Sequence, residues 1–545
     1  MAVLALIAAV PYARTWRFGF VHMDDYQFAV RGAWFFDSWE NVHRAFLHDV
    51  WEFFGEESSL YRPLLLLPRF FETRLFGVSP GPYHVLNTAL HAASVLALFY
   101  LLRALTRSPR AAAVWAAIFA VHPAHVPVVA WIEGRNNSML ALFVVSAVVL
   151  ALRALETERR AVAVASAMAF FAALLTKENA VVTPLLCVGA YALRRRSEAP
   201  PPPSAKLLRE MVGAWTLALL VWAALRAHAV PVTPELEWSH IARSLSRNYP
   251  GPLLYWGKVF FPVNLAPLPI LRDSSLAPGV VAAALYALLW RRSAPLDRFA
   301  LAYGAAWFIL LISPSLLVDR LTSPTGAVFR EDRLYQASMG PLLALAWITR
   351  GAIDRRFTEM RPVAIMALVA AVLAGQSLMG RYADGYAFFS AAVDASPHLA
   401  SAWAHLGDMQ VERGEWAAAR DSYERARALN PMCPTLNNNY GLLLMHDGDL
   451  ARADLFLLRE LEVNPSFIRA HYNRGLLRGR MGDLRGAVES FEAFLAAGAT
   501  DRELVLMSRL ALIDAYRRLG RSDRVEQVTR DLAASGATLE PSHPR

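Results

Sequence analysis

The stretch MLALFVVSAVVLALRAL, from Met139 to Leu155, contains a single charged residue, Arg153. Similar apolar stretches recur up to about Gly380, and the 545 residues are 55% hydrophobic with a mean hydropathy of +0.30. Because a helix satisfies its own backbone hydrogen bonds in lipid, this pattern predicts an all-α, polytopic membrane bundle of about 11 spans over residues 1–380. The other expected spans are Val3–Pro11, Tyr83–Leu105, Ala111–Val121, Ala161–Leu175, Ala180–Leu193, Leu207–Leu225, Pro278–Trp290, Phe299–Ile312, Leu334–Thr349 and Val363–Met379.

The net charge of +9 comes almost entirely from arginine, and many arginines follow alternate apolar segments in short clusters. This placement indicates cytoplasmic loops rather than a nucleic-acid surface. The clusters are Arg103/Arg107/Arg110, Arg153/Arg159/Arg160, Arg194/Arg195/Arg196, Arg291/Arg292/Arg298 and Arg350/Arg355/Arg356. The rule that basic loops stay inside then puts the loop Phe20–Pro82 and the C-terminal third outside the cytoplasm.

Two smaller features accompany this topology. Leu253–Leu265 is apolar but short, and it contains Lys258 and Pro262, so we expect a re-entrant or interfacial helix there. The two cysteines, Cys187 in an apolar stretch and Cys433 in the charged C-terminal third, are not expected to pair.

The C-terminal third, residues 381–545, contains an internal repeat. Prolines recur 34 residues apart at Pro397, Pro431 and Pro465, and glycines and alanines keep the same interval at Gly407/Gly441/Gly475, Gly414/Gly448/Gly482 and Ala419/Ala453/Ala487. This period predicts stacked helical hairpins near 397–430, 431–464 and 465–498, with a degenerate fourth at 501–532. The first unit resembles the tetratricopeptide repeat, which implies a groove that binds a peptide or protein; a spacer or dimerisation module is the alternative.

The first outer loop begins with FVHMDDYQFAVRG, Phe20–Gly32, which places Asp24 and Asp25 side by side. Carboxylates at the water boundary of a membrane can bind a cation or take a proton from a substrate hydroxyl. A solvated loop start is the alternative interpretation.

Further polar groups interrupt or end the apolar segments. The string YHVLNTALH puts His84, Asn87 and His91 on one helix face, either as metal ligands or as a hydrogen-bonded packing stripe. The strings VHPAHVPVVAWIEGRNN, TKEN and EDRLYQAS add His122, His125, Glu133, Arg135, Asn136, Lys177, Glu178 and Arg333. These groups converge on the predicted outer face, where they suit a lipid-anchored substrate with an anionic head.

In this order and spacing the strings FVHMDD, YRPL, YHVLNTALH, HPAHVPVVAWIEGR, TKEN, LLYWGKVFFPVNL and DRLYQASMG, followed by the repeats, resemble the transmembrane and tetratricopeptide repeat-containing proteins. These are polytopic glycosyltransferases of the C superfamily, related to the protein O-mannosyltransferases. The resemblance implies transfer of a sugar, often mannose, from a polyprenyl-phosphate donor to a Ser or Thr hydroxyl of a protein outside the cytoplasm.

Carried over by the resemblance, Asp24 or Asp25 would act as general base, or the two would hold Mg²⁺ or Mn²⁺ against the donor phosphate. Arg333, Arg135 and Lys177 would bind that phosphate, and His122, His125, Glu133, Glu178, His84, Asn87 and His91 would support the site. One position departs from the family, because Pro127 stands where a glutamate is usual. Either Glu133 substitutes for that carboxylate, or the acceptor differs, or this member is inactive.

The sequence therefore predicts an inverting, lipid-phosphate-sugar-dependent hexosyltransferase whose repeats bind the protein acceptor. Inversion is expected for a single displacement in which the base activates the acceptor opposite the departing phosphate. Two alternatives remain: a non-enzymatic membrane scaffold that recruits periplasmic proteins, and transfer of the sugar to a lipid or an envelope polysaccharide.

Overall fold

The computed structural model describes residues 1–54, 58–198, 202–230, 238–316, 328–499 and 501–534. These residues form helices and no strand, and a single antiparallel bridge joins Ile270 to Val328. Contacts divide the chain into two compact units with a boundary between Ser396 and Pro397. The all-α class predicted from the sequence is confirmed within the described residues.

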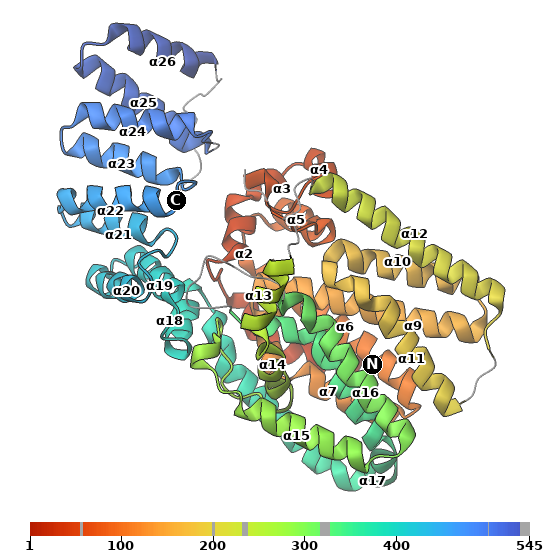
Figure 1. The fold of residues 1–545 in the computed structure, drawn as a ribbon. Helices are drawn as coiled ribbons and strands as arrows, with labels where there is room; N and C mark the ends of the chain where they lie inside the picture. The colour runs from red at the N-terminus through yellow and green to blue at the C-terminus, as the bar shows by residue number, and fades with distance from the viewer. Residues whose placement is uncertain (55–57, 199–201, 231–237, 317–327, 500, 535–545) are drawn as a thin grey trace. The chain divides into compact units, whose positions relative to one another are not determined.

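The first unit carries helices α1 to α18 (Figure 1). They are α1 (Ala2–Ala9), α2 (Asp24–Tyr26), α3 (Ala33–Phe36), α4 (Val42–Leu47), α5 (Pro63–Phe76), α6 (Pro80–Thr106), α7 (Pro109–Ala120), α8 (Val126–Ala130), α9 (Arg135–Thr157), α10 (Arg160–Thr176), α11 (Thr183–Glu198), α12 (Ala205–Ala229), α13 (Trp238–Asn248), α14 (Gly251–Phe260), α15 (Ala277–Arg292), α16 (Pro295–Ile312), α17 (Leu334–Met379) and α18 (Gly385–Ala395).

The number of spans differs from the prediction of about 11. In the described residues, five helical stretches are long and apolar enough to cross a membrane: Pro80–Thr106, Ile132–Thr157, Ala205–Ala229, Pro295–Leu316 and Glu331–Tyr382. A sixth is added if α7 and the stretch Pro123–Ala130, which meet at 56°, count as one broken span. The prediction was too high because several apolar segments form shorter helices, such as the 16 residues of α11 and of α15, where about 20 are needed.

The last two predicted spans form one helix of 46 residues, α17, in which Arg356 has non-helical angles of φ −119° and ψ 27°. A straight helix of that length would separate its ends by about 70 Å. Instead, Glu331 before α17 lines the same pocket as Leu378, Arg381 and Tyr382 at its other end. The helix therefore folds back at Arg356, and both of its ends lie at the same end of the bundle.

Close contacts between helix backbones occur where glycine removes a side chain. A Cβ atom on Gly340 of α17 would lie 2.4 Å from the Gly304 carbonyl oxygen of α16. Likewise, a Cβ atom on Gly279 of α15 would lie 2.1 Å from the Leu253 carbonyl oxygen of α14. Helix α14, within the segment expected to be re-entrant or interfacial, has only 10 residues and ends before Pro262, so it is too short to cross a bilayer.

The second unit is a series of helical hairpins (Figure 1). Its helices are α19 (Ala400–Glu412), α20 (Trp416–Leu429), α21 (Leu436–His446), α22 (Leu450–Val463), α23 (Arg469–Arg480), α24 (Leu484–Ala496), α25 (Arg502–Arg518) and α26 (Ser522–Ala534). Gly414, Gly448 and Gly482 turn between paired helices with φ of +74°, +83° and +79°, which only glycine adopts readily. The 34-residue interval read from the sequence is thus the length of one hairpin.

Glu460, which departs from the usual small residue of the repeat, has a structural role. Its side chain is fully buried and accepts hydrogen bonds from the backbone N–H groups of Thr435 at 2.8 Å, Asn437 at 3.1 Å and Asn438 at 3.3 Å. A carboxylate at a helix N-terminus satisfies donors that have no partner within the helix. Glu460 therefore caps α21 from the neighbouring helix α22.

Candidate functional site

Asp24 and Asp25 lie in a short turn of helix, but their side chains have different surroundings. Asp25 is 1% exposed and accepts hydrogen bonds from the backbone N–H groups of Val21 at 2.8 Å, Met23 at 3.1 Å and Tyr26 at 2.9 Å. Burial raises the pKa of Asp25 to about 6, against the lowering effect of those N–H groups. Asp24 is partly exposed. The carboxylate of Asp25 thus holds the loop, whereas the carboxylate of Asp24 can contact a substrate.

Arg330 is a partly buried basic group that lines a pocket together with Met23 of this loop. Its guanidinium donates to both oxygens of Asp332, at 3.0 and 3.3 Å, and lies 4.1 Å from the ring centre of Trp131. Burial lowers the pKa of Arg330, but Asp332 and, more weakly, Asp24 together hold it above its ordinary value. Met23, the residue before Asp24, and Arg330 line the same pocket.

Two further cations surround Asp332. Lys177 donates to the Asn137 side-chain oxygen at 2.7 Å, and the Asn137 amide donates to Asp332 at 2.9 Å. Burial lowers the pKa of Lys177 to about 7, and the positive charges of Arg62, Arg333 and Arg330 contribute to the lowering. Arg333 is partly exposed, and it forms no ion pair with any residue that the structure describes. We call Lys177, Arg330 and Arg333 the cation cluster.

A small pocket opens beside Arg330, and its lining combines charged and aromatic groups. It is lined by Met23, Pro127, Trp131, Pro267, Leu268, Arg330, Glu331, Asp332, Tyr382 and Phe388. Met23 is the residue before Asp24. The pocket therefore lies between the acidic loop and Arg330.

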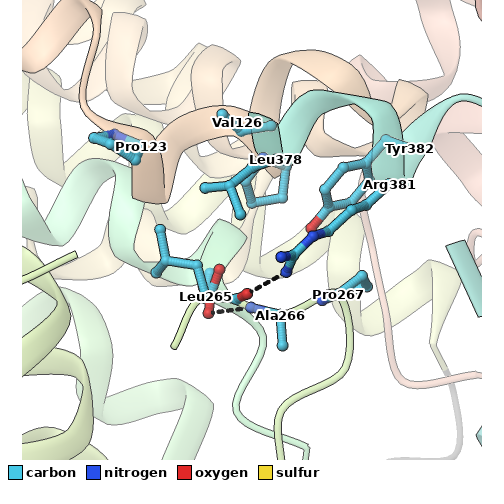
Figure 2. Close-up of a pocket in the computed structure, with 10 residues that line it drawn as sticks. Pro123, Val126, Leu265, Ala266, Pro267, Leu378, Arg381 and Tyr382 are labelled. Carbon is cyan, nitrogen blue, oxygen red and sulfur yellow. Dashed lines mark hydrogen bonds between the residues drawn. The ribbon is translucent and has the colours of Figure 1, made fainter. Parts of the chain in front are cut away.

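An adjoining pocket shares Pro127, Pro267, Glu331 and Tyr382 with the first (Figure 2). Glu331 is buried, pairs with Lys258 at 2.6 Å and accepts the Ala266 N–H at 2.9 Å. Arg381 donates to the Leu265 carbonyl at 2.7 Å. Pro127, where the resembled family has glutamate, lines both pockets, so the departure in sequence falls within the candidate site.

The four histidines named from the sequence are buried and hydrogen-bonded inside the bundle. His91 contacts the Tyr335 hydroxyl at 2.6 Å and the Ala120 carbonyl at 2.9 Å. His125 contacts the Phe119 carbonyl at 2.9 Å and the Ser338 hydroxyl at 3.0 Å. The remaining two follow the same pattern, since His122 contacts the Val259 carbonyl at 3.0 Å and His84 the Gly19 carbonyl at 3.4 Å. The geometry favours the packing interpretation over ligation.

Arg135 and Asn87 belong to a buried charged network. Arg135 is fully buried and donates to both oxygens of Glu72, at 2.8 and 2.7 Å, to the Tyr83 carbonyl at 3.2 Å and to the Asn87 side chain at 3.0 Å. With these bonds formed, its guanidinium is turned away from solvent and phosphate. The structure thus gives Arg135 a role in holding α5, α6 and α9 together.

Two glutamates predicted to support the site also form internal ion pairs. Glu133 is 2% exposed and pairs with the buried Arg69, so it does not face the pockets in place of the missing glutamate. Glu178 accepts from Arg62 at 3.1 and 3.2 Å and from the Tyr61 N–H at 3.1 Å. Glu178 therefore links the loop Phe20–Pro82, through Tyr61 and Arg62, to the end of α10.

The residues do not fit a divalent cation at the acidic pair. Both oxygens of Asp25 accept backbone N–H groups, and the described residues contain no group of three or more His, Cys, Asp or Glu arranged to hold a metal ion. We derive no step through Mg²⁺ or Mn²⁺.

Sequence reasoning missed Arg330, Trp131 and the pocket role of Tyr382. The run REDR, Arg330–Arg333, was a usable signal, because charged residues at the start of an apolar helix are costly in a membrane and often mark a functional site. Trp131 and Tyr382 gave no signal, since single aromatic residues at the ends of apolar segments are common.

No protein-family model matches the chain. Among curated proteins, it is 32% identical over 127 residues to the protein O-mannosyl-transferase Tmtc1 of Drosophila melanogaster, a match that covers 23% of this chain and 15% of that protein. It is also 29% identical over 97 residues to the protein FlbA of Caulobacter vibrioides, covering 17% of this chain and 16% of FlbA.

Among solved structures, the crystal structure of yeast Tom70 aligns with 82% of this chain and 92% of its own, at 12% identity and a TM-score of 0.20. The two curated matches cover only a small part of the relatives' own lengths. The match to the O-mannosyl-transferase is confined to 127 residues of a chain in which several helices are long and apolar enough to span a membrane.

Proposed function

We propose that the chain is a membrane hexosyltransferase that moves a sugar, mannose or another hexose, from a polyprenyl-phosphate donor to a Ser or Thr hydroxyl of a protein outside the cytoplasm. The observation that carries this proposal is the pocket lined by Met23, the residue before the partly exposed Asp24, and by Arg330 of the cation cluster. A carboxylate next to cations suits a reaction between a hydroxyl and a phosphate-linked sugar.

In the proposed step, Asp24 takes the proton of the acceptor hydroxyl while the hydroxyl oxygen attacks the anomeric carbon of the sugar. The bond between that carbon and the phosphate oxygen breaks, and polyprenyl phosphate leaves with the electron pair. Arg333, which forms no ion pair with a described residue, binds the phosphate, and Arg330 and Lys177 add positive charge. One displacement inverts the anomeric centre.

The fold-back of α17 supports an acceptor supplied by the repeats. Both ends of α17 line one pocket, and the Gly19 N–H, shortly before Asp24, donates to the Ala383 carbonyl after α17 at 2.8 Å. The chain therefore leaves the first unit at the end of the bundle that carries Asp24. Under the proposal, this end faces the periplasm of a bacterial inner membrane.

Pro127 favours a second candidate function, a non-enzymatic scaffold. It lines both pockets at the position where the resembled family has a carboxylate. A chain without this carboxylate could retain lipid-phosphate binding and recruit proteins without transferring sugar.

The test is sugar transfer by the purified full chain in nanodiscs, with polyprenyl-phosphate mannose as donor and a Ser/Thr-containing peptide as acceptor. Asp24→Asn should reduce transfer about 100-fold or more, because general bases contribute at least that factor. Asp25→Asn should instead lower the melting temperature, because one amide oxygen cannot replace a carboxylate that accepts three N–H groups.

Asp37→Asn, at an exposed aspartate of the same loop, is the matched control and should behave as the wild type. Full transfer by a folded Asp24→Asn protein would remove Asp24 from the mechanism. Donor binding without transfer in the wild type would favour the scaffold.

A further inference from the structure

The arginine clusters that were predicted to be cytoplasmic differ in how their charge is balanced. Four of the five clusters contain an arginine that pairs with an acidic side chain; the pairs are Arg107–Glu198 at 2.6 Å, Arg160–Glu210 at 2.7 Å, Arg194–Glu156 and Arg350–Asp297 at 3.6 Å. In the fifth cluster, Arg291, Arg292 and Arg298 form no ion pair with any residue that the structure describes. The positive charge of this cluster therefore has no counterpart within the described chain.

The unbalanced cluster lies beside the end of α11, where two further arginines are found. Arg298 donates to the Trp290 carbonyl at 3.1 Å and to the Arg291 carbonyl at 2.8 Å, which joins the start of α16 to the end of α15. The guanidinium of Arg196, near the end of α11, lies 4.2 Å from the ring centre of Phe299, the residue after Arg298. Helix α16 packs against both α11 and α15 (Figure 1). We call Arg195, Arg196, Arg291, Arg292 and Arg298 the arginine patch.

The acidic residues next to the arginine patch have other partners. Glu198 accepts hydrogen bonds from Arg107 at 2.6 and 2.8 Å. Asp297 accepts the Trp347 Nε1–H at 2.9 Å and pairs with Arg350. Neither carboxylate is therefore free to neutralise the patch.

The guanidinium groups of the patch are accessible. All five arginines are exposed. The acceptors of Arg195 and Arg196 are uncharged groups of α11, a hydroxyl at 3.2 Å and a carbonyl at 3.5 Å. The side chains of Arg291 and Arg292 form no hydrogen bond with a residue that the structure describes. Five positive charges are thus available to a ligand.

Exposed apolar side chains lead up to the patch along two of its helices. On α15, Val281 and Leu285 are exposed four residues apart, and Arg292 follows Leu285 by seven residues. On α11, Val188 is exposed and Arg195 follows it by seven residues. These spacings place the apolar side chains and the arginine of each helix on one face. A ligand of the patch therefore has apolar surface beside its charged group.

Helix α16 sets the depth at which the patch lies. The stretch Pro295–Leu316 is long and apolar enough to cross a membrane, and Arg298 lies in its first turn. The ends of a membrane span lie at the level of the phospholipid headgroups. An anion bound here would have its charge among the headgroups and apolar surface toward the bilayer centre. This is the chemistry of an anionic phospholipid and not of a soluble anion.

We propose that the arginine patch binds an anionic phospholipid whose headgroup carries two phosphate groups, with its acyl chains along the exposed apolar faces of α11 and α15. Guanidinium groups bind phosphate oxygens bidentately, and five of them exceed the charge of a single phosphate. Basic pockets between membrane helices on the cytoplasmic side recognise headgroups of this kind. The inference goes beyond the proposed sugar transfer and does not depend on it.

The experiment measures lipid binding to the delipidated full chain in detergent by native mass spectrometry. Tetraoleoyl cardiolipin supplies two phosphates in one headgroup, dioleoyl phosphatidylglycerol supplies one, and dioleoyl phosphatidylcholine has no net charge. We expect cardiolipin to bind about 10-fold or more tightly than phosphatidylcholine, because several arginines contribute to binding an anionic headgroup. At equal phosphate concentration it should also bind about threefold or more tightly than phosphatidylglycerol.

Arg291→Gln/Arg292→Gln should reduce the affinity for cardiolipin about 10-fold or more, because it removes two of the five charges. Both side chains are exposed, so the variant should keep the melting temperature of the wild type when no lipid is added. Arg153→Gln/Arg159→Gln is the matched control. It removes two exposed arginines from another cluster predicted to be cytoplasmic, and it should bind cardiolipin as the wild type does.

A second measurement follows the melting temperature. Cardiolipin should raise it more for the wild type than for Arg291→Gln/Arg292→Gln, since a ligand that binds only the folded state stabilises that state. If the double variant melts lower without lipid, Arg292→Gln alone is measured, and a loss of affinity of about threefold is expected.

Four outcomes would overturn the proposal: cardiolipin binding no tighter than phosphatidylcholine, phosphatidylglycerol binding as tightly as cardiolipin at equal phosphate, an unchanged affinity of the folded patch variant, or an equal loss in the control variant. Asp24→Asn should bind cardiolipin as the wild type does. A failure of lipid binding and a failure of sugar transfer are therefore distinguishable.

Discussion

At the scale of single residues, burial decides which charged groups can act on a substrate. The polar atoms of Asp25 and Arg135 are committed to backbone N–H groups and to Glu72. Asp24 and Arg333 remain partly exposed near the pocket. The candidate site is thus formed by the charged side chains that stay accessible, Asp24 and Arg333.

Lys177 gives a prediction at the same scale. Its pKa in the folded chain is lowered to about 7, while an unfolded lysine keeps its ordinary value near 10.5. Between these values the unfolded chain binds more protons than the folded one, so the free energy of unfolding rises with pH. Lys177→Met removes this dependence.

The measurement is the melting temperature of both proteins in detergent at pH 6 and pH 9. We expect the advantage of Lys177→Met over the wild type to be larger at pH 6, where the buried ammonium is charged, and to shrink at pH 9. A difference between the two proteins that does not change with pH would contradict the shifted pKa.

At the scale of elements, glycine sets how closely α16 and α17 approach. The backbones meet at Gly304 and Gly340, where small residues let membrane helices pack without side chains between them. Gly213 in α12 has no atom within 4 Å of the position that a Cβ would occupy. Gly340 and Gly213 both lie in helices, yet we expect substitution by alanine to change the stability of the protein in opposite directions at the two positions.

Gly340→Ala should destabilise the protein by about 1–3 kcal/mol, because the added methyl group collides with a backbone that cannot move aside. Gly213→Ala should leave stability unchanged or raise it by up to about 1 kcal/mol, since alanine is the better helix former. Melting temperatures of the two purified variants in the same detergent check this. A drop for Gly213→Ala as large as that for Gly340→Ala would show that the close contact with α16 does not set the effect at Gly340.

At the scale of the whole molecule, α17 determines where the chain leaves the bundle. Because it folds back at Arg356, the residues after Met379 return to the end that carries Arg330 and Asp24. A helix that crossed once would have ended on the opposite side. The C-terminal repeats and the candidate site are therefore expected in the same compartment.

Reporter fusions in a bacterial host test this expectation. Alkaline phosphatase fused after the repeats should be active and green fluorescent protein at the same place dark, because the first folds outside the cytoplasm and the second inside. Fusions after Arg356, in the cluster predicted to be cytoplasmic, should give the reverse pattern. Fluorescence of the green fluorescent protein fused after the repeats would place the repeats in the cytoplasm, on the opposite side of the membrane from the proposed site.

The sequence by itself determined the classes of local structure. The 34-residue interval and the apolar segments identify helical hairpins and a helix-rich apolar region, because periodicity is a property of neighbouring residues. The sequence also located the acidic pair and Arg333. It overestimated the number of spans, since an apolar segment shows that a helix is buried without showing whether lipid or protein surrounds it.

Only the tertiary structure decided which of the polar residues are committed to internal bonds. Arg135 pairs with Glu72, 63 residues away in the chain, and His91 with Tyr335, 244 residues away, so no local pattern could reveal these partners. The same holds for Arg330, whose guanidinium lies 4.1 Å from the ring centre of Trp131, a residue far away in the chain. Whether a charged side chain stays accessible depends on its burial and on ion-pair partners far away in the sequence, and both are set by the folded chain.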